Sequence, residues 1–255
     1  MLKLIWYGTN SIKLIYNNNS ILFDPFIRYE KRNDGNFYKN FYDTKNIFIT
    51  HGHIDHTMDL DMLYSDKNVK IHTTKSPYKR LLKDKFTKSN LVMIKHNDSF
   101  NVGSFNVKVL KSKHIKFDLK LIVNTLFNKD VIKYHDYLKI LIKNNFKCRE
   151  KNETVLYFIS VNKVRIILSG SMALDKKITY PKNVDYLILA YQGRSDLDKK
   201  IVNIIKVIKP KNIILTHFDN SFPPISKNVN ISNLRNVIPS NIGLIIPEYE
   251  KEIVL

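Results

Sequence analysis

The sequence predicts an α/β fold in which two mixed β-sheets pack face to face and helices cover their outer faces. Short apolar runs that suit strands alternate with segments of helical periodicity in both halves of the chain. Hydrophobic residues make up 44% of the 255 residues, enough to fill a core between packed layers. Because no internal repeat or low-complexity linker divides the chain, we expect a single domain over residues 1–255.

The strands of the first half are predicted from apolar runs rich in Ile, Leu, Val and Phe, which favour extended structure. These runs lie at residues 2–7, 12–16, 21–23, 47–50, 69–72, 91–95 and 105–110. One helix is predicted at residues 78–86, because Ser76 and Pro77 stand where helices commonly begin.

The second half follows an interruption of this strand pattern. Residues 115–152 end in apolar residues with helical spacing, which predicts a helical insertion into the domain. Beyond it, strands are predicted at residues 155–161, 164–168, 186–190, 213–216 and 243–246, and helices at 200–208 and 232–237. Asn162 and Lys163 predict a hairpin between the first two of these strands.

Four metal-competent side chains lie within six residues, directly after the strand predicted at 47–50. They are His51, His53, Asp55 and His56. Imidazole nitrogens and carboxylate oxygens are preferred ligands of zinc and similar divalent ions. Side chains alternate along extended backbone, so His51 and His53 should project to the same side, and the other two follow as the chain bends into a helix. We therefore predict a metal site rather than a chance cluster in a surface loop.

This string resembles the HxHxDH signature of the metallo-β-lactamase superfamily, and further landmarks occur in the same order along the chain. Residues 6–11 and 21–25 resemble the opening hairpin of the branch that includes ascorbate-phosphate lactonase-like hydrolases. His114 and His217 stand where the family places its third and last metal-binding histidines. The resemblance implies a four-layer αββα sandwich with the metals at one edge, on strand-end loops.

The resemblance also implies one or two zinc ions, with Mn²⁺ or Fe as other metals that suit the donor set. The ligands would be His51, His53 and His114 on one ion, and Asp55, His56 and His217 on the other. Many dinuclear members carry a bridging aspartate after a later glycine, whereas this chain has Ser171 after Gly170. Its hydroxyl is not ionised at neutral pH, so the bridging carboxylate is missing. Ser171 stays a candidate for a role beside the metals or the substrate.

Other polar residues are candidates for supporting roles. Asp24 and Asp219 would fix the orientation of metal-bound imidazoles, which such histidines usually require. Each could instead serve a turn, because prolines follow closely after both. Arg194, after a predicted strand end, would clamp an anion or simply be exposed.

The other three histidines are assigned no role. His72 and His96 fall at ends of short apolar strands and are expected to be surface or capping residues. His135 lies in the predicted insertion and could line the pocket or face water. The insertion itself could form a lid over the metal cleft, or serve in oligomerisation or plain packing. Its aromatic residues are Phe117, Phe127, Tyr134 and Tyr137.

Charge and composition limit the partners. The formal net charge of +19 would attract anionic small-molecule substrates, but the cations are mostly Lys rather than Arg, which disfavours specific binding of nucleic acid. No apolar stretch approaches the ~20 residues needed to span a bilayer, and residues 1–3 lead into a strand rather than a signal-peptide core. We expect a cytoplasmic protein without a membrane partner, in agreement with a single cysteine, Cys148.

The function expected from the resemblance is that of a metallo-hydrolase. Zinc lowers the pKa of bound water from ~15.7 toward ~7, so a metal-bound hydroxide could attack a small ester, lactone or phosphodiester. Asp55 would be the catalytic residue that orients this nucleophile and accepts its proton. Two alternatives stay open, a metal-dependent nuclease acting on RNA or DNA and a non-catalytic metal-binding protein. The net charge motivates the first, which is disfavoured because nothing here resembles the long extra domain of RNA-processing relatives, and the serine at position 171 motivates the second.

Overall fold

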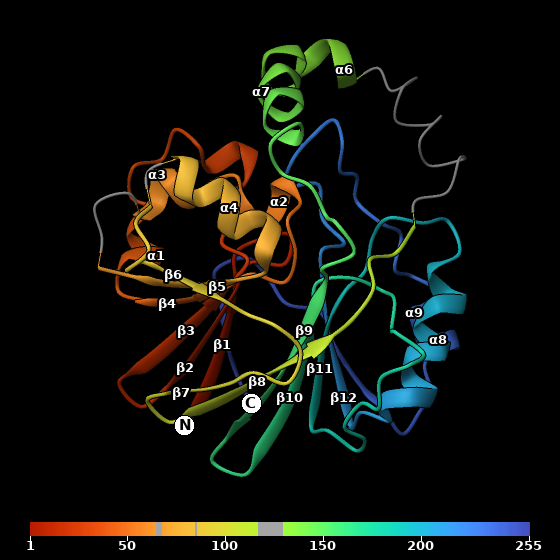
Figure 1. Ribbon diagram of the computed structural model, residues 1–255. Helices are drawn as coiled ribbons and strands as arrows, with labels where there is room; N and C mark the ends of the chain where they lie inside the picture. The colour runs from red at the N-terminus through yellow and green to blue at the C-terminus, as the bar shows by residue number, and fades with distance from the viewer. Residues whose placement is uncertain (65–67, 85, 117–129) are drawn as a thin grey trace.

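Two seven-stranded sheets pack face to face in the computed structural model, and helices cover their outer faces (Figure 1). The structure describes residues 1–64, 68–84, 86–116 and 130–255. The predicted α/β class and four-layer αββα arrangement are confirmed.

The first sheet is mixed and has the order β14-β1-β2-β3-β4-β5-β6. Strands β14, β1, β2 and β3 pair antiparallel, and β3 to β6 pair parallel. Their bounds are β1 (Leu2–Trp6), β2 (Ile12–Tyr16), β3 (Asn19–Phe23), β4 (Asn46–Phe48), β5 (Lys70–Thr73), β6 (Leu91–Met93) and β14 (Glu252–Val254).

The second sheet has the order β13-β12-β11-β10-β9-β8-β7, with antiparallel pairing from β7 to β10 and parallel pairing from β10 to β13. Its strands are β7 (Ser99–Val102), β8 (Phe105–Lys111), β9 (Val155–Val161), β10 (Val164–Ser169), β11 (Tyr186–Ala190), β12 (Asn212–Thr216) and β13 (Gly243–Ile245). The sequence pattern missed β7 and β14. Both are edge strands without a fully buried residue, so they lack the apolar run that marks the others.

Helices α1, α3 and α4 lie outside the first sheet, and α8 and α9 outside the second (Figure 1). Within the described residues the helices are α1 (Lys39–Tyr42), α2 (Ile54–Thr57), α3 (Leu60–Tyr64), α4 (Lys75–Asp84), α6 (Asp130–Lys133), α7 (His135–Asn145), α8 (Leu197–Ile208) and α9 (Leu234–Val237), with a 3-10 turn at Tyr29–Lys31. None of the described helices combines the length and apolar composition that a bilayer crossing requires.

Helices α6 and α7 stand at one end of the sandwich and belong to the predicted insertion (Figure 1). Tyr137 of α7 is buried, and Tyr134, directly before the helix, packs edge-on against Tyr29. Phe117 and Phe127, which the sequence offered for a lid, lie outside the described residues.

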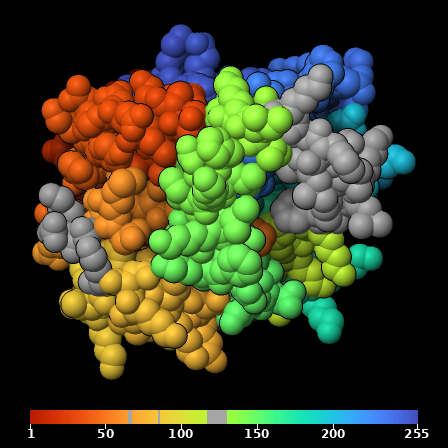
Figure 2. Space-filling view, turned by 90° about the horizontal axis from the view of Figure 1, so that it is seen from above, coloured from red at the N-terminus to blue at the C-terminus, as the bar shows by residue number. Residues whose placement is uncertain are grey.

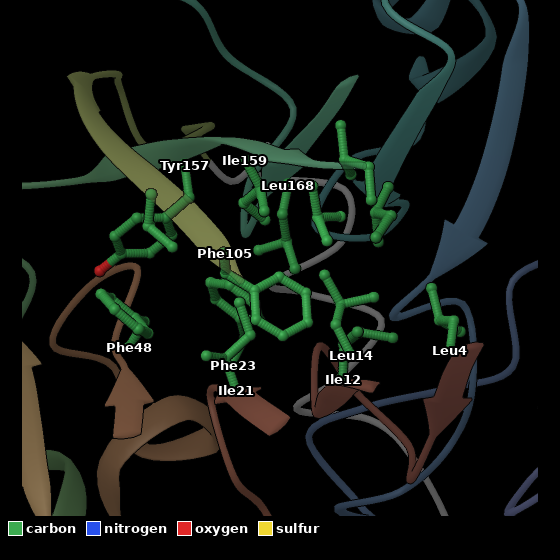
Figure 3. Close-up of a cluster of buried hydrophobic side chains, with 14 of the residues drawn as sticks. Leu4, Ile12, Leu14, Ile21, Phe23, Phe48, Phe105, Tyr157, Ile159 and Leu168 are labelled. Atoms are coloured by element: carbon green, nitrogen blue, oxygen red, sulfur yellow. The ribbon is translucent and has the colours of Figure 1, made fainter. Parts of the chain in front are cut away.

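The main core fills the space between the two sheets (Figure 3). Inward-facing side chains of the first sheet meet those of the second because alternate residues of each strand point to the same face. The residues in contact include Leu4, Leu14, Phe23 and Phe48 from the first sheet, and Phe105, Tyr157, Ile159 and Leu168 from the second.

His72 is part of this interior, so the prediction that it is a surface or capping residue was wrong. Its ring stacks on Phe48, with 4.2 Å between centroids, and meets Phe100 edge-on at 4.6 Å. It lies on an inner strand, β5, where alternation turns it toward the opposite sheet. Burial, aided by Lys70, lowers the pKa of His72 to about 4, so the ring is neutral at pH 7.

Candidate metal centre

The predicted metal ligands lie in segments that follow strands of both sheets. His51 and His53 follow β4, and Asp55 and His56 lie in the short helix α2 directly after them. The other two histidines follow strands of the second sheet: His114 comes after β8 and His217 directly after β12. Folding therefore brings together side chains that are up to 166 positions apart, since 217 − 51 = 166.

The first group consists of His51, His53 and His114, whose candidate ligand atoms all lie within 4.8 Å of one another. The Nε2 atom of His51 is 3.2 Å from the Nδ1 atom of His53. The ring of His114 is centred 4.4 Å from that of His53. Two nitrogens that share a tetrahedral ion at ~2.0–2.1 Å are about 3.3 Å apart, so this spacing fits a zinc-like ion.

The second group consists of Asp55, His56 and His217, again within 4.8 Å of one another. The Oδ2 atom of Asp55 lies 2.7 Å from the Nε2 atom of His217 and 3.2 Å from that of His56. The rings of His51 and His56 are centred only 4.0 Å apart, so the two groups are neighbours. The donor set can hold two adjacent divalent ions.

The electrostatics of the first group also suit a cation. Burial, with the neighbouring His56, lowers the pKa of His51 well below its usual range, and burial with His53 lowers the pKa of His114 to about 4. Both rings are therefore neutral at pH 7, and their lone pairs are available for a metal.

In the second group, burial alone would raise the pKa of Asp55, but the imidazoles of His56 and His217 hold it well below the usual range. Burial opposes a charge on His56, yet the carboxylates of Asp55 and Asp24 raise its pKa to about 10. The buried carboxylates of Asp55 and Asp24 thus favour a positive charge beside His56, and a divalent ion would supply that charge.

Asp24 lies directly behind the second group, in contact with an imidazole as the sequence suggested. Its Oδ2 atom accepts hydrogen bonds from Nδ1 of His56 at 2.8 Å, the Asn10 amide at 2.7 Å and the Thr50 hydroxyl at 2.6 Å. Oδ1 accepts from the backbone N–H of Thr50 at 2.7 Å. Asp24 also has a positive φ of 42°, so the turn and the orienting role occur together.

Thr50 is a residue that sequence reasoning missed. Its hydroxyl lies 3.0 Å from Nδ1 of His51 while it donates to Asp24. Gly170 leaves room for this side chain, because a Cβ atom there would lie 2.2 Å from the Thr50 hydroxyl oxygen. The position of Thr50, directly before the histidine cluster, was the one available signal.

Asp219 does not orient an imidazole through the hydrogen bonds seen in the described residues, contrary to the expectation. Its carboxylate accepts from the backbone N–H of Thr9 at 3.1 Å, from the Tyr249 hydroxyl at 3.0 Å and from the Ser221 hydroxyl. The N–H of His217 in turn donates to the carbonyl of Thr9 at 2.8 Å. Asp219 therefore supports His217 through the backbone of the first hairpin.

Ser171 and Arg194 both form hydrogen bonds with the backbone at the start of the predicted insertion. The Ser171 hydroxyl accepts from the N–H of Ile115, the residue after His114, at 2.9 Å. The Arg194 guanidinium pairs with Asp196 and donates to the carbonyl of Lys116 at 2.9 Å. Both residues line the cavity next to the predicted ligands.

The six predicted ligands share one cavity of about 560 Å³. Helix α7 lies across this end of the molecule, as the green segment of Figure 2 shows. The other described lining residues are Ile54, Ile115, Ile142, Asn145, Phe146, Gly170, Ser171, Ala190, Gln192, Gly193, Arg194, Phe222, Ile225, Lys227, Asn228 and Val229. Exposed His135 and half-buried His96 are not among them.

Residues 3–217 match the family model of the beta-lactamase superfamily domain. The chain belongs to the beta-lactamase superfamily. This confirms the resemblance drawn from the HxHxDH string. The superfamily fold and the two His/Asp groups both support the binding of divalent metal ions. A comparison with curated proteins gives no match.

Solved structures with the same fold span nearly the whole chain. Igni18, a metallo hydrolase from the archaeon Ignicoccus hospitalis, has a TM-score of 0.67 at 14% identity, and the match covers 99% of this chain and 97% of Igni18. An isothiocyanate hydrolase from Delia radicum gut bacteria has a TM-score of 0.63 at 13% identity, with 99% of this chain and 98% of that protein covered.

A third relative in fold, CmlA from Streptomyces venezuelae, is a diiron beta-hydroxylase. Its TM-score is 0.64 at 12% identity, and the match covers 100% of this chain and 54% of that protein. At these identities the comparisons show a shared fold, and the chemistry of this chain has to be argued from its own site.

Proposed function

We propose that this protein is a zinc-dependent hydrolase of a small ester, lactone or phosphodiester. The observation that carries the proposal is the convergence of two groups of His and Asp donors, each within 4.8 Å, in one cavity. Superfamily membership and the hydrolases among its neighbours in fold, one of them a metallo hydrolase, support it.

In this proposal His51, His53 and His114 hold one ion, and Asp55, His56 and His217 hold the second. Such ions supply an activated water nucleophile and a positive field for the oxygen that becomes negative. Asp55 would orient the attacking water and accept its proton. Asp24 would keep the metal-binding ring of His56 in the correct orientation, and Thr50 would do the same for His51.

The direct test combines metal analysis with substrate screening. We expect the purified protein to carry one or two zinc equivalents and to hydrolyse a member of an ester, lactone, phosphodiester and β-lactam panel. His53→Ala should abolish turnover, whereas His135→Ala, at an exposed position, should leave it unchanged. Because CmlA, which shares this fold over 54% of its length, is a diiron beta-hydroxylase, the metal-free protein should also be reloaded separately with Zn²⁺, Mn²⁺ and Fe²⁺.

The same experiment separates the alternatives. Metal-free protein with unchanged turnover would overturn the proposal. Bound metal without turnover on any substrate class would indicate a non-catalytic metal-binding protein. The net charge of +19 keeps a nuclease as the second candidate, and salt-sensitive cleavage of RNA or DNA would favour it. The cytoplasmic location stays a prediction.

A further inference from the structure

Three large apolar side chains are exposed around the cavity that holds the predicted metal ligands. Ile142 is 48% exposed and Phe146 70% exposed at the end of α7, and Ile225 is 38% exposed in the loop after β12. These three residues, which we call the apolar wall, come from segments more than 75 positions apart, since 225 − 146 = 79. Apolar groups that gather around a cavity mark a ligand-binding surface more often than isolated ones do.

The apolar surface continues from the wall toward the metal ligands. Ile54, next to Asp55, and Phe222 are buried residues of the same cavity. The ring of Phe222 is centred 5.9 Å from that of His217. When the reacting group of a bound substrate faces the donor atoms, the rest of the substrate therefore extends along apolar side chains.

Charge in the cavity is sparse by comparison. Apart from the predicted ligands, Arg194 and Lys227 are the charged residues among the described lining residues. The Arg194 guanidinium is already engaged by Asp196 and the carbonyl of Lys116. Outside the predicted ligands, a substrate that carries many charges, such as a polynucleotide, would meet few charged side chains to replace the water molecules that hydrate those charges.

The α7 part of the wall, Ile142 and Phe146, belongs to a segment that is packed against the helix carrying two predicted metal ligands. Tyr137 and Leu141 of α7 pack in one buried cluster with Ile54 and Met58, which belong to or directly follow α2. A partly buried ion pair adds a second connection: Arg32 donates to Asp59 at 3.0 Å and to the Tyr137 hydroxyl at 3.1 Å. Because α2 also carries Asp55 and His56, the α7 part of the wall is already positioned beside these predicted ligands in the absence of substrate.

We propose that the substrate is an ester or lactone with an apolar side group, an alkyl chain of several carbons or an aromatic ring, that packs against Ile142, Phe146 and Ile225. The inference rests on the proposed hydrolase function and names its substrate class. The carbonyl group would face the six donor side chains, and the apolar group would cover the wall.

The test uses two series that differ only in alkyl chain length. One series consists of straight-chain methyl esters from acetate to octanoate, with kcat/KM measured on the metal-loaded protein. The other consists of the matching carboxylates, which are the hydrolysis products, with binding measured by calorimetry. We expect each added methylene to raise both quantities about fourfold until the wall is covered.

Phe146→Ala should reduce kcat/KM and affinity for the octanoate compounds at least about tenfold, and for the acetate compounds less than about twofold. The matched control is Ile140→Ala. Ile140 lies on the same helix and is 49% exposed, but it does not line the cavity, so this change should alter neither series.

The outcomes separate this inference from the proposed function. Turnover or binding that does not depend on chain length would overturn the apolar wall and leave the hydrolase intact. Chain-length-dependent binding that Phe146→Ala removes, without turnover of any ester, lactone or phosphodiester, would support the wall and overturn the hydrolase. Equal loss with acetate and octanoate compounds in Phe146→Ala would also overturn the wall, because the defect would then be general.

Discussion

The hydroxyl of Thr50 determines which nitrogen of His51 is free to bind a metal. A hydroxyl has one proton, and the 2.6 Å contact with the Asp24 carboxylate takes it. Thr50 must then accept a hydrogen bond from Nδ1–H of His51 at 3.0 Å, which leaves Nε2 unprotonated and directed at His53. Asp24 fixes His56 in the same way through Nδ1. One buried carboxylate therefore sets the tautomer of a histidine in each metal group.

At this scale we predict that Thr50→Val weakens metal binding by about 10- to 100-fold, the range typical of groups that orient metal ligands. Valine keeps the shape of threonine but removes the hydroxyl. The measurement is a competition titration with a chromophoric chelator. Thr50→Ser should retain most of the affinity because it retains the hydroxyl. Equal affinity of the wild type and Thr50→Val would show that the hydroxyl has no such role.

Among the elements, the loop that carries the predicted ligands His51 and His53 packs backbone to backbone against the end of the predicted insertion. Gly52 lies between His51 and His53, and a Cβ atom on it would be 2.5 Å from the carbonyl oxygen of Arg149. The hydroxyl of Ser76 donates to the same carbonyl at 3.4 Å. The insertion thus returns to the sandwich in direct contact with the loop that presents the first ligands.

For these elements we predict that Gly52→Ala lowers the free energy of unfolding by about 1–3 kcal/mol, as overpacking against a rigid backbone does. It should also weaken metal binding, because the loop must move away from Arg149. Gly35→Ala is the matched control: no atom lies within 4 Å of a Cβ at Gly35, so stability should stay within about 1 kcal/mol. Urea unfolding of the metal-free proteins measures the free energy of unfolding of both variants. Similar stabilities for the two variants would contradict the contact.

On the scale of the whole molecule, the candidate metal centre draws its donors from both sheets. The donors after β4 belong to the first sheet, and His114 and His217 follow strands of the second. Ions held by ligands from both sheets would bind the folded state and not the unfolded chain, so their binding energy adds to the stability of the sandwich.

We therefore predict that removal of metal lowers the melting temperature. At a free metal concentration of 100 times Kd, binding stabilises the folded state by about 2.7 kcal/mol, which corresponds to roughly 5–10 °C for a chain of this size. Calorimetry with and without a strong chelator measures the change, and the same chelator saturated with zinc is the control. An unchanged melting temperature after complete metal removal would mean that the ions do not connect the sheets.

Much of the fold could be predicted because its elements are marked locally. Residues 12–16, 155–161 and 186–190 form strands within their predicted bounds, since each carries a run of apolar residues that a buried strand requires. The edge strands β7 and β14 escaped prediction because half-exposed strands carry no such run. Helix α8 begins at Leu197 rather than 200, a difference of one turn at its start.

By itself the sequence determined the family and the local cluster from His51 to His56, because ligands at short spacing on one turn need no long-range contact to lie together. Only the tertiary structure decided the partners of residues distant in the chain. In the folded protein His72 is buried in the core, and Asp219 accepts hydrogen bonds from Thr9 and Tyr249. The Thr50 hydroxyl lies between Asp24 and His51. The physical reason is that a hydrogen bond or a buried contact depends on which loops meet at the sheet edge, and this is set by the packing of both sheets.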